Sequence, residues 1–181
     1  MVDVLRKKRV SSAAEIGYSL ESIYNQYHKN VYNYIAFRIN NHHDAEELAS
    51  DVFVKAIGGW KSYDHSFPME GWLIGIAKNV VTDYLRRTMR RKTLPFESIL
   101  ELVSADKQPE EVVIINEDSR KLMSAMVKLR DKERQILSMK FATELKHSEI
   151  AVLLKISESH VGVTAHRAMN KLKKLMEEDA I

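Results

Sequence analysis

Apolar residues recur at steps of three and four along most of this 181-residue sequence. The stretch LESIYNQYHKNVYNYIAFRI, residues 20–39, shows the pattern clearly, with isoleucine, valine and tyrosine at helical spacing. The whole chain contains three prolines and six glycines, the residues that most disfavour the interior of a helix. We find no segment with the two-residue alternation of a strand. The sequence therefore predicts an all-α protein.

Short polar stretches separate the predicted helices. The turn residues NNHH, 40–43, are followed by Asp44, which is placed to cap a helix that Gly58 and Gly59 end. The polar loop KSYDHSFPME, residues 61–70, leads into a helix that begins near Pro68 and runs into a cluster of arginines.

The composition changes between residues 94 and 108, where the helical periodicity weakens and three acidic residues stand against one lysine. We interpret this segment as an acidic, flexible linker between two small helical domains, residues 19–93 and residues 109–178. Pro109 is expected to restart a helix. Residues 1–18 are basic but lack the apolar segment of a signal peptide, so we interpret them as a flexible tail.

Several classes of protein are excluded or disfavoured by what the sequence lacks. The absence of cysteine excludes disulfides, thiolate catalysis and cysteine-ligated zinc. No apolar run approaches the ~20 residues of a membrane helix, so membrane insertion is not expected. His42 and His43 lack further ligands at metal-binding spacing, so we expect no metal and no other cofactor. No paired carboxylates, Ser-His-Asp set or glycine-rich phosphate loop is present, so neither an enzyme nor a small-molecule substrate is expected.

The helix GWLIGIAKNVVTDYLRRTMRRK, residues 71–92, has one apolar arc and one polar stripe. The apolar arc contains Trp72, Leu73, Ile76, Ala77, Val80 and Tyr84, and the stripe contains Gly75, Asn79, Asp83, Arg86 and Arg90. Five of the nine residues from Tyr84 to Lys92 are basic, Arg87 among them. Such density suits phosphates, because neutralising them releases counterions. The alternative is a solvated face on which Asp83 pairs with a neighbouring arginine.

Residues near this stripe suit contact with bases. The amide of Asn79 offers both a donor and an acceptor to a base edge. Aromatic rings, which stack on unpaired bases, lie close by in the sequence at Trp60, Tyr63, His65, Phe67 and Trp72. The first domain is therefore predicted to bind nucleic acid.

The second domain contains a helix-turn-helix pattern in HSEIAVLLKISESHVGVTAHRAMNKLKK, residues 147–174. Ile150, Ala151 and Leu154 are expected to face the core, Ser157 to cap the second helix, and Val161 and Ala165 to anchor it. The outer face offers a major groove Glu158, Ser159, His160, Val163, His166 and Arg167, and Lys171 is expected to contact phosphate. A helix hairpin without any DNA-binding role fits the same pattern.

Three stretches together resemble a known family. DAEELASDVFVKA, residues 44–56, resembles region 2.2 of bacterial RNA polymerase sigma factors of the extracytoplasmic-function (ECF) group. GWLIGIAKNVVTDYLRR, residues 71–87, resembles their regions 2.3 and 2.4, and residues 129–172 resemble their region 4. The resemblance extends over about residues 19–176.

The resemblance implies a role for each surface. The helix from Asp44 would dock on the clamp coiled coil of the large catalytic subunit of core RNA polymerase, through Glu46, Glu47, Leu48 and Asp51. The −10 element would be melted and held by Tyr63, Asp64, His65, Phe67, Trp72, Asn79, Asp83, Arg86, Arg87 and Arg90. The −35 element would be read by Glu158, Ser159, His160, Val163, His166, Arg167 and Lys171. The linker would lie along the RNA exit path.

The implied function is that of an ECF sigma factor, which directs transcription initiation of a stress or envelope regulon and is cytoplasmic. Its partners would be core RNA polymerase, promoter DNA and an anti-sigma factor. Two alternatives stay open. One is a stand-alone helix-turn-helix transcriptional regulator that binds duplex DNA without polymerase. The other is a helical interaction module whose basic stretch meets an acidic protein.

This sequence departs from the family pattern at four positions. Arg130 stands where proline is usual, and Lys155 stands where the turn of the helix-turn-helix usually has glycine. Lys155 would have to adopt a left-handed conformation or shift the turn, at a cost of about 1 kcal/mol. Gly162 and Val163 replace polar or basic residues, so weak or unusual −35 recognition is expected.

Overall fold

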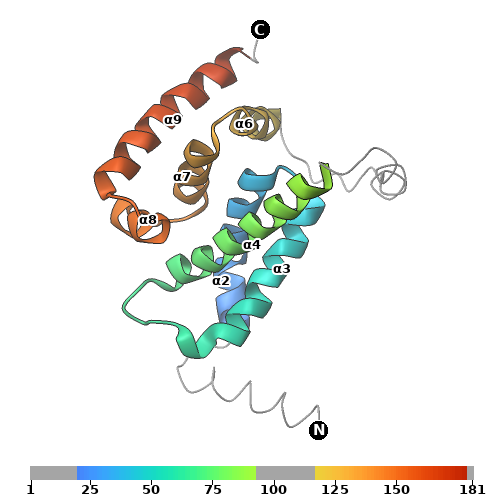
Figure 1. Ribbon diagram of the computed structural model, residues 1–181, viewed down its shortest axis with the longest axis vertical. Coiled ribbons are helices and arrows are strands. Elements are labelled where there is room, and N and C mark those ends of the chain that lie inside the picture. Colours follow the sequence, from blue (N-terminus) through green and yellow to red (C-terminus); the bar gives the residue numbers. More distant parts are fainter. Residues whose placement is uncertain (1–19, 93–116, 179–181) are drawn as a thin grey trace.

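The computed structural model describes residues 20–92 and 117–178 (Figure 1). Every regular element in these two ranges is helical, and no strand occurs in them. The elements are α2 (Leu20–Ile39), α3 (His42–Gly59), the 3-10 turn η1 (Trp60–Ser62), α4 (Met69–Lys92), α6 (Glu117–Val127), α7 (Asp131–Ala142), α8 (His147–Leu154) and α9 (Glu158–Glu178). The all-α prediction is confirmed, as are two small helical domains, α2–α4 and α6–α9.

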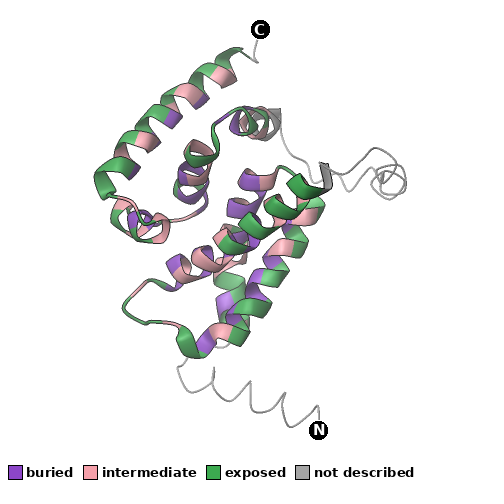
Figure 2. Cartoon of the chain, in the orientation of Figure 1, coloured by how far each residue is buried: buried purple, intermediate pink, exposed green. Residues whose placement is uncertain are grey.

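The first domain packs α2, α3 and α4 around one apolar core, and the buried faces of these helices turn toward one another (Figure 2). From the predicted apolar arc of α4, Leu73, Ala77 and Val80 are buried. Trp72, Ile76 and Tyr84 are half-buried, whereas Ile74 and Val81, outside the predicted arc, are fully buried. The buried arc is broader than predicted because α2 and α3 both pack against α4.

The cap of α3 differs from the prediction. Asn41, and not Asp44, is the N-cap, because its side-chain oxygen accepts a hydrogen bond from the Asp44 N–H at 3.2 Å. The helix therefore begins at His42 and contains both histidines that the sequence placed in a turn. Asp44 lies in the first turn, where the helix dipole favours an acidic side chain, and its carboxylate also accepts a hydrogen bond from the Tyr84 hydroxyl of α4.

The second domain contains the predicted helix-turn-helix. Lys155 ends α8 with φ 55° and ψ 46°, which is the left-handed conformation, the first of the two alternatives expected for this position. The Ser157 side chain accepts a hydrogen bond from the His160 N–H at 3.2 Å and thereby caps α9. Ile150 and Ala151 of α8 and Val161 and Ala165 of α9 are buried, as predicted, and Leu154 is half-buried.

The two domains pack directly against each other, which the sequence did not predict. One apolar core contains Leu73 and Ile35 of the first domain together with Ile136, Met139 and Ile150 of the second. Arg38, at the end of α2, is 4% exposed, and its Nη2 lies 2.7 Å from Oδ1 of Asp131 at the start of α7. In Figure 1, α7 and α8 lie beside α2 and α4, and α9 forms the outer side of the molecule.

Some expectations fall on residues that the structure does not describe. The tail of residues 1–18, the linker of residues 94–108 and the helix start at Pro109 lie outside the described ranges, and the second domain is described from Glu117 onward. Among the described helices, none combines the length and the apolar character needed to cross a membrane.

Replacing Lys155 by glycine is expected to stabilise the protein. Glycine adopts the left-handed conformation of this position without the steric cost that lysine carries, so the free energy of unfolding should rise by about 1 kcal/mol. Urea denaturation followed by circular dichroism measures the change. Lys173→Gly, on the exposed side of α9, is the matched control and should lower stability by about 1 kcal/mol. A loss of stability in Lys155→Gly would contradict the account of this turn.

Candidate nucleic-acid interface

The loop between η1 and α4 is held in shape by its own hydrogen bonds. The Tyr63 hydroxyl donates to the Phe67 carbonyl oxygen at 2.8 Å. The backbone N–H and the hydroxyl of Ser66 donate to the two carboxylate oxygens of Asp64 at 2.9 and 2.7 Å. The backbone bond and then the hydroxyl bond of Ser66 lower the pKa of Asp64, so its carboxylate stays charged. The loop is therefore preformed, with Asp64 and His65 exposed at its tip.

Gly71 fixes where this loop meets α4. A side chain at position 71 would overlap the ring of Phe67, so the close approach of ring and helix requires glycine. Gly71 is not among the residues predicted from the sequence. The sequence did contain one signal for this contact, which is a glycine four residues after an aromatic residue at the start of a helix.

The aromatic side chains of this region form a cluster, and its members differ in exposure. Trp60 is 5% exposed and belongs to the core, so the expectation that it stacks on bases is wrong. Trp72 is half-buried against Trp60 and Tyr63, with ring centroids at 5.9 and 4.9 Å. Tyr63 also contacts the exposed ring of His65 at 4.6 Å. The structure thus brings Tyr63, His65 and Trp72 together at the surface.

The polar stripe of α4 is exposed over most of its length. Asn79, Asp83, Arg86, Arg87 and Arg90 are all exposed. Asp83 and Arg86 form an ion pair at 3.2 Å within the helix, as the solvated-face alternative predicted for this pair. Gly75 differs from the rest of the stripe because it is half-buried, and a Cβ placed on it would lie 3.3 Å from Leu153 of the second domain.

A crevice of about 370 Å³ separates α4 from α8. The first domain contributes to its walls Phe67, Trp72, Ile76 and Asn79, and the second contributes Val152 and Leu153. Lys78 links the two helices by donating from Nζ to the Leu153 carbonyl oxygen at 2.9 Å. The rings of Phe67 and Trp72 and the Asn79 amide, all expected to hold a base, therefore line a space that the second domain partly closes.

The outer face of α9 carries the predicted residues in exposed positions: Glu158, Ser159, His160, Val163, His166 and Arg167. Lys171 differs, because its Nζ donates to Oε2 of Glu133 on α7 at 3.3 Å. Burial raises the pKa of Glu133, but the Arg130 N–H and the Lys171 ammonium outweigh it and lower the pKa overall. Lys171 therefore already has an acidic partner inside the chain.

Gly162 on α9 is not required by space. A Cβ at this position would lie 3.7 Å from Nδ1 of His147, which is an ordinary van der Waals contact. The helix would accept a larger residue here, so the glycine lowers the helical propensity of α9 without any packing reason that the structure provides.

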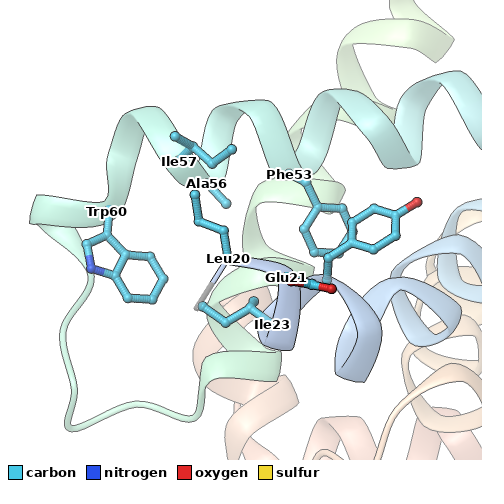
Figure 3. A pocket seen from close by; sticks show the side chains of 8 residues that line it. Leu20, Glu21, Ile23, Phe53, Ala56, Ile57 and Trp60 are labelled. Carbon is cyan, nitrogen blue, oxygen red and sulfur yellow. The ribbon is translucent and has the colours of Figure 1, made fainter. Parts of the chain in front are cut away.

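The surface of α3 is acidic in its first half and apolar toward its end. Glu46, Glu47 and Asp51 are exposed, whereas Leu48 is half-buried against the core. Figure 3 shows a mainly apolar groove at the other end of α3, with a volume of about 270 Å³. Its walls come from the start of α2, the end of α3 and η1, and include Ile23, Phe53, Ala56, Ile57 and Trp60.

One exposed group at the start of α3 has the composition of a weak metal site. His43, Asp44 and Glu47 bring one ligand atom each within 4.8 Å of one another. His43 lies 3.9 Å from a carboxylate oxygen of each acidic residue, and these contacts are those of surface ion pairs. Exposed acidic groups are common without a metal, and we assign none here.

Comparison with known proteins identifies both domains. Residues 23–91 match the family model for Sigma-70 region 2, and residues 125–174 match the model for Sigma-70, region 4. The chain belongs to the sigma-70 family, in its ECF group. The first matched range contains α3, the loop and nearly all of α4, and the second contains the helix-turn-helix.

Two relatives from Bacillus subtilis (strain 168) are similar over nearly their whole length. The RNA polymerase sigma factor YlaC is 32% identical over 159 residues, which cover 87% of this chain and 92% of the relative. The ECF RNA polymerase sigma factor SigM is 30% identical over 158 residues, covering 87% of this chain and 94% of the relative. The fold also matches the sigma factor RpoE from Bartonella quintana, solved with the anti-sigma factor NepR, at TM-score 0.68 and 16% identity, over 85% of this chain and 94% of that one.

The side chains that join the two domains were not predicted from the sequence. Glu70 accepts a hydrogen bond from the Asn30 amide at 2.6 Å and another from the Glu144 backbone N–H at 3.2 Å. Arg38 and Lys78 reach across to the second domain in the same way. No sequence signal distinguishes these residues, because a single charge on a helix usually faces water.

Proposed function

We propose that this ECF sigma factor binds core RNA polymerase, recognises −10 and −35 promoter elements and directs transcription initiation of a stress or envelope regulon. One observation carries the proposal: the domain that matches Sigma-70 region 2 exposes a preformed aromatic loop beside the Asn79 stripe, and the domain that matches region 4 exposes the outer face of its helix-turn-helix. Two separate surfaces suited to nucleic acid are thus combined in one chain.

The first surface is proposed to hold the melted −10 element. Tyr63, His65, Phe67 and Trp72 would stack against an unpaired base, and the exposed amide of Asn79 would pair with its edge. Asp64 at the loop tip would accept hydrogen bonds, because its lowered pKa favours the ionised carboxylate. The strand backbone would follow Arg86, Arg87 and Arg90, with Asp83 orienting Arg86.

The second surface is proposed to read the −35 element in the major groove through the exposed face of α9, residues 158–167. This face includes one arginine, Arg167, and Lys171 is already paired with Glu133. With so few charged side chains available to contact bases and phosphates, recognition of the −35 element would be weak or unusual. The choice of promoter would then depend mainly on the −10 surface.

The acidic surface of α3 is proposed to dock on the clamp coiled coil of the polymerase. Glu46, Glu47 and Asp51 are exposed and available to a basic partner. Leu48 is half-buried, so its role there would be to hold the helix on the core more than to make the contact. Recognition of charge favours fast and specific association.

The remaining assignments are part of the same proposal. Because RpoE was solved with NepR, an anti-sigma factor is proposed as a partner of this chain. The chain would act in the cytoplasm and would itself make or break no bond, since the polymerase carries the chemistry. The tail, the linker and the boundaries 19–93 and 109–178 stay predictions. The stand-alone regulator is not supported, because residues 23–91 match sigma region 2.

Reversing one charge on α3 is expected to disrupt docking. Asp51→Lys should weaken binding to core polymerase by about tenfold, because an exposed acidic contact is replaced by repulsion. Fluorescence anisotropy with labelled chain and purified core polymerase measures the change. Glu177→Lys, the same charge change at the exposed end of α9, is the control and should leave binding unchanged. Equal effects of the two variants would argue against docking through α3.

Removing one proposed phosphate contact is expected to change the salt dependence of DNA binding. Arg87→Ala should weaken the binding of the polymerase complex to all promoters nearly uniformly and reduce the slope of log affinity against log salt by about 1. Lys140→Ala, an exposed cation on α7, is the control. An unchanged slope in Arg87→Ala would place this arginine in solvent, as the solvated-face alternative holds.

A further inference from the structure

The outer face of α9 carries little fixed charge. Within residues 158–167, Arg167 brings one positive charge and Glu158 brings one negative charge, so the two cancel. Lys171, one turn further along α9, is already bound to Glu133 of α7. Much of the affinity of a DNA-binding protein comes from cations that neutralise phosphates. A further source of positive charge is therefore needed if this face is to bind DNA.

Two histidines on the same face can supply that charge. His160 and His166 are exposed on either side of Val163, three residues from it in each direction. An imidazole gains a proton, and with it a positive charge, as the pH falls from about 8 to about 5. Among the side chains of residues 158–167, only imidazoles ordinarily change charge in this range. The outer face of α9 therefore gains up to two positive charges as the pH falls.

A third imidazole lies against this helix at Gly162. His147 is the first residue of α8, and a Cβ added to Gly162 would lie 3.7 Å from its Nδ1 and 4.0 Å from its Cε1. The histidine is half-buried, and its Nε2 is buried without a hydrogen-bond partner among the described residues. A larger side chain at position 162 would cover the edge of the ring that carries Nδ1. Glycine leaves that edge open, one helical turn from His166.

Helices α6 and α7, which both pack against α9, bring no free carboxylate to these rings. Helix α6 packs on the second half of α9, around Leu172, beyond the residues of the outer face. The two carboxylates of α7 are both engaged elsewhere. Asp131 is bound by Arg38, and Glu133 is bound by Lys171.

Helix α8 and the outer face itself contribute the remaining charges. The Glu149 carboxylate accepts a hydrogen bond from the Lys146 N–H at 2.7 Å, and Lys146 and Lys155 are exposed at the two ends of α8. Glu158 and Arg167 lie on α9. None of the described carboxylates forms an ion pair or a hydrogen bond with the three imidazoles. Because the imidazoles have no acidic partner among the described residues, an acidic partner from outside, such as a phosphate, can bind them.

We propose that the outer face of α9 binds the −35 element through imidazolium groups, so that pH controls its affinity for DNA. Protonated His160 and His166 supply the cationic contacts to phosphates that this face otherwise lacks. His147 adds a third contact through the edge that Gly162 leaves open. Binding is tight at acidic pH, where the imidazoles are charged, and weak near about pH 8, where they are neutral. This inference rests on the proposed function, since it concerns how the same face of α9 binds DNA.

The pH dependence of promoter binding tests this proposal. Core polymerase carrying the full chain is titrated onto a labelled promoter fragment from a start site that the chain directs, and fluorescence anisotropy follows binding at constant ionic strength. The affinity should be at least about tenfold higher at about pH 6 than at about pH 8, and the slope of log affinity against log salt should be steeper by about 2. The same fragment cut between the two elements lacks the −35 element, so its pH dependence measures all other contacts.

Two pairs of substitutions at exposed positions separate the effect of charge from that of shape. His160→Gln with His166→Gln removes the protonation sites and should give the weak affinity of about pH 8 at both pH values. His160→Lys with His166→Lys fixes the positive charge and should give the tight affinity of about pH 6 at both. His42→Gln, at an exposed histidine of α3, is the matched control and should keep the full pH dependence.

A double-mutant cycle tests the third contact. His147→Ala should weaken binding to the intact fragment about threefold, and Gly162→Leu should do the same because its side chain covers the ring. The two changes together should cost no more than either one alone, since both remove the same contact. Losses that simply multiply would show that His147 does not act through the opening at Gly162.

The outcomes separate this inference from the proposed function. If the intact and the cut fragments show the same pH dependence, or if the double glutamine variant keeps the pH dependence of the unmodified chain, control by imidazolium groups is overturned while the proposed function stands. If polymerase with the chain binds the promoter no better than core polymerase alone at either pH, the proposed function fails and this inference fails with it.

Discussion

Helix α2 is buried on two sides, and the positions of both domains depend on it. Val31, Tyr34 and Ile35 are almost completely inaccessible, and burial raises the pKa of Tyr34 to about 12. The same helix packs against α3 and α4 of its own domain and against α7 of the other. Arg38 at its end completes the second contact through Asp131. Because one helix holds both domains to a shared core, a change at the junction alters the spacing of the two candidate DNA surfaces.

Helix α4 carries both a packing surface and a candidate binding surface. On α4, the buried arc holds the first domain together, and Arg86, Arg87 and Arg90 are exposed. Gly75 and Lys78 lie between these regions and contact α8. Helix α8 therefore lies beside the part of α4 that carries Asn79, whereas Glu46, Glu47 and Asp51 of α3 are exposed. The residues proposed for docking and those proposed for holding a base thus lie on different elements of the first domain.

Local patterns predicted the helices and the exposed faces, whereas long-range contacts were not predictable. Three- and four-residue spacing located the helices. The left-handed turn at Lys155 was one of two alternatives expected from the resemblance to the family, which usually has glycine there. Trp60 was misassigned because its burial depends on neighbours from α2 and α4 that a sequence does not place. Asn41 displaced Asp44 as the cap because two competing capping residues stood in one turn. The pair of Arg38 and Asp131, far apart in sequence, had no local signal.

The central claim is that this chain directs RNA polymerase to promoters, and genome-wide run-off transcription tests it most directly. Purified core polymerase of the source organism would be compared with and without the chain. The account predicts new start sites that share two upstream motifs, the −10 motif more sharply defined than the −35 motif. No new start sites, together with no binding of the chain to core polymerase in a pull-down, would contradict it.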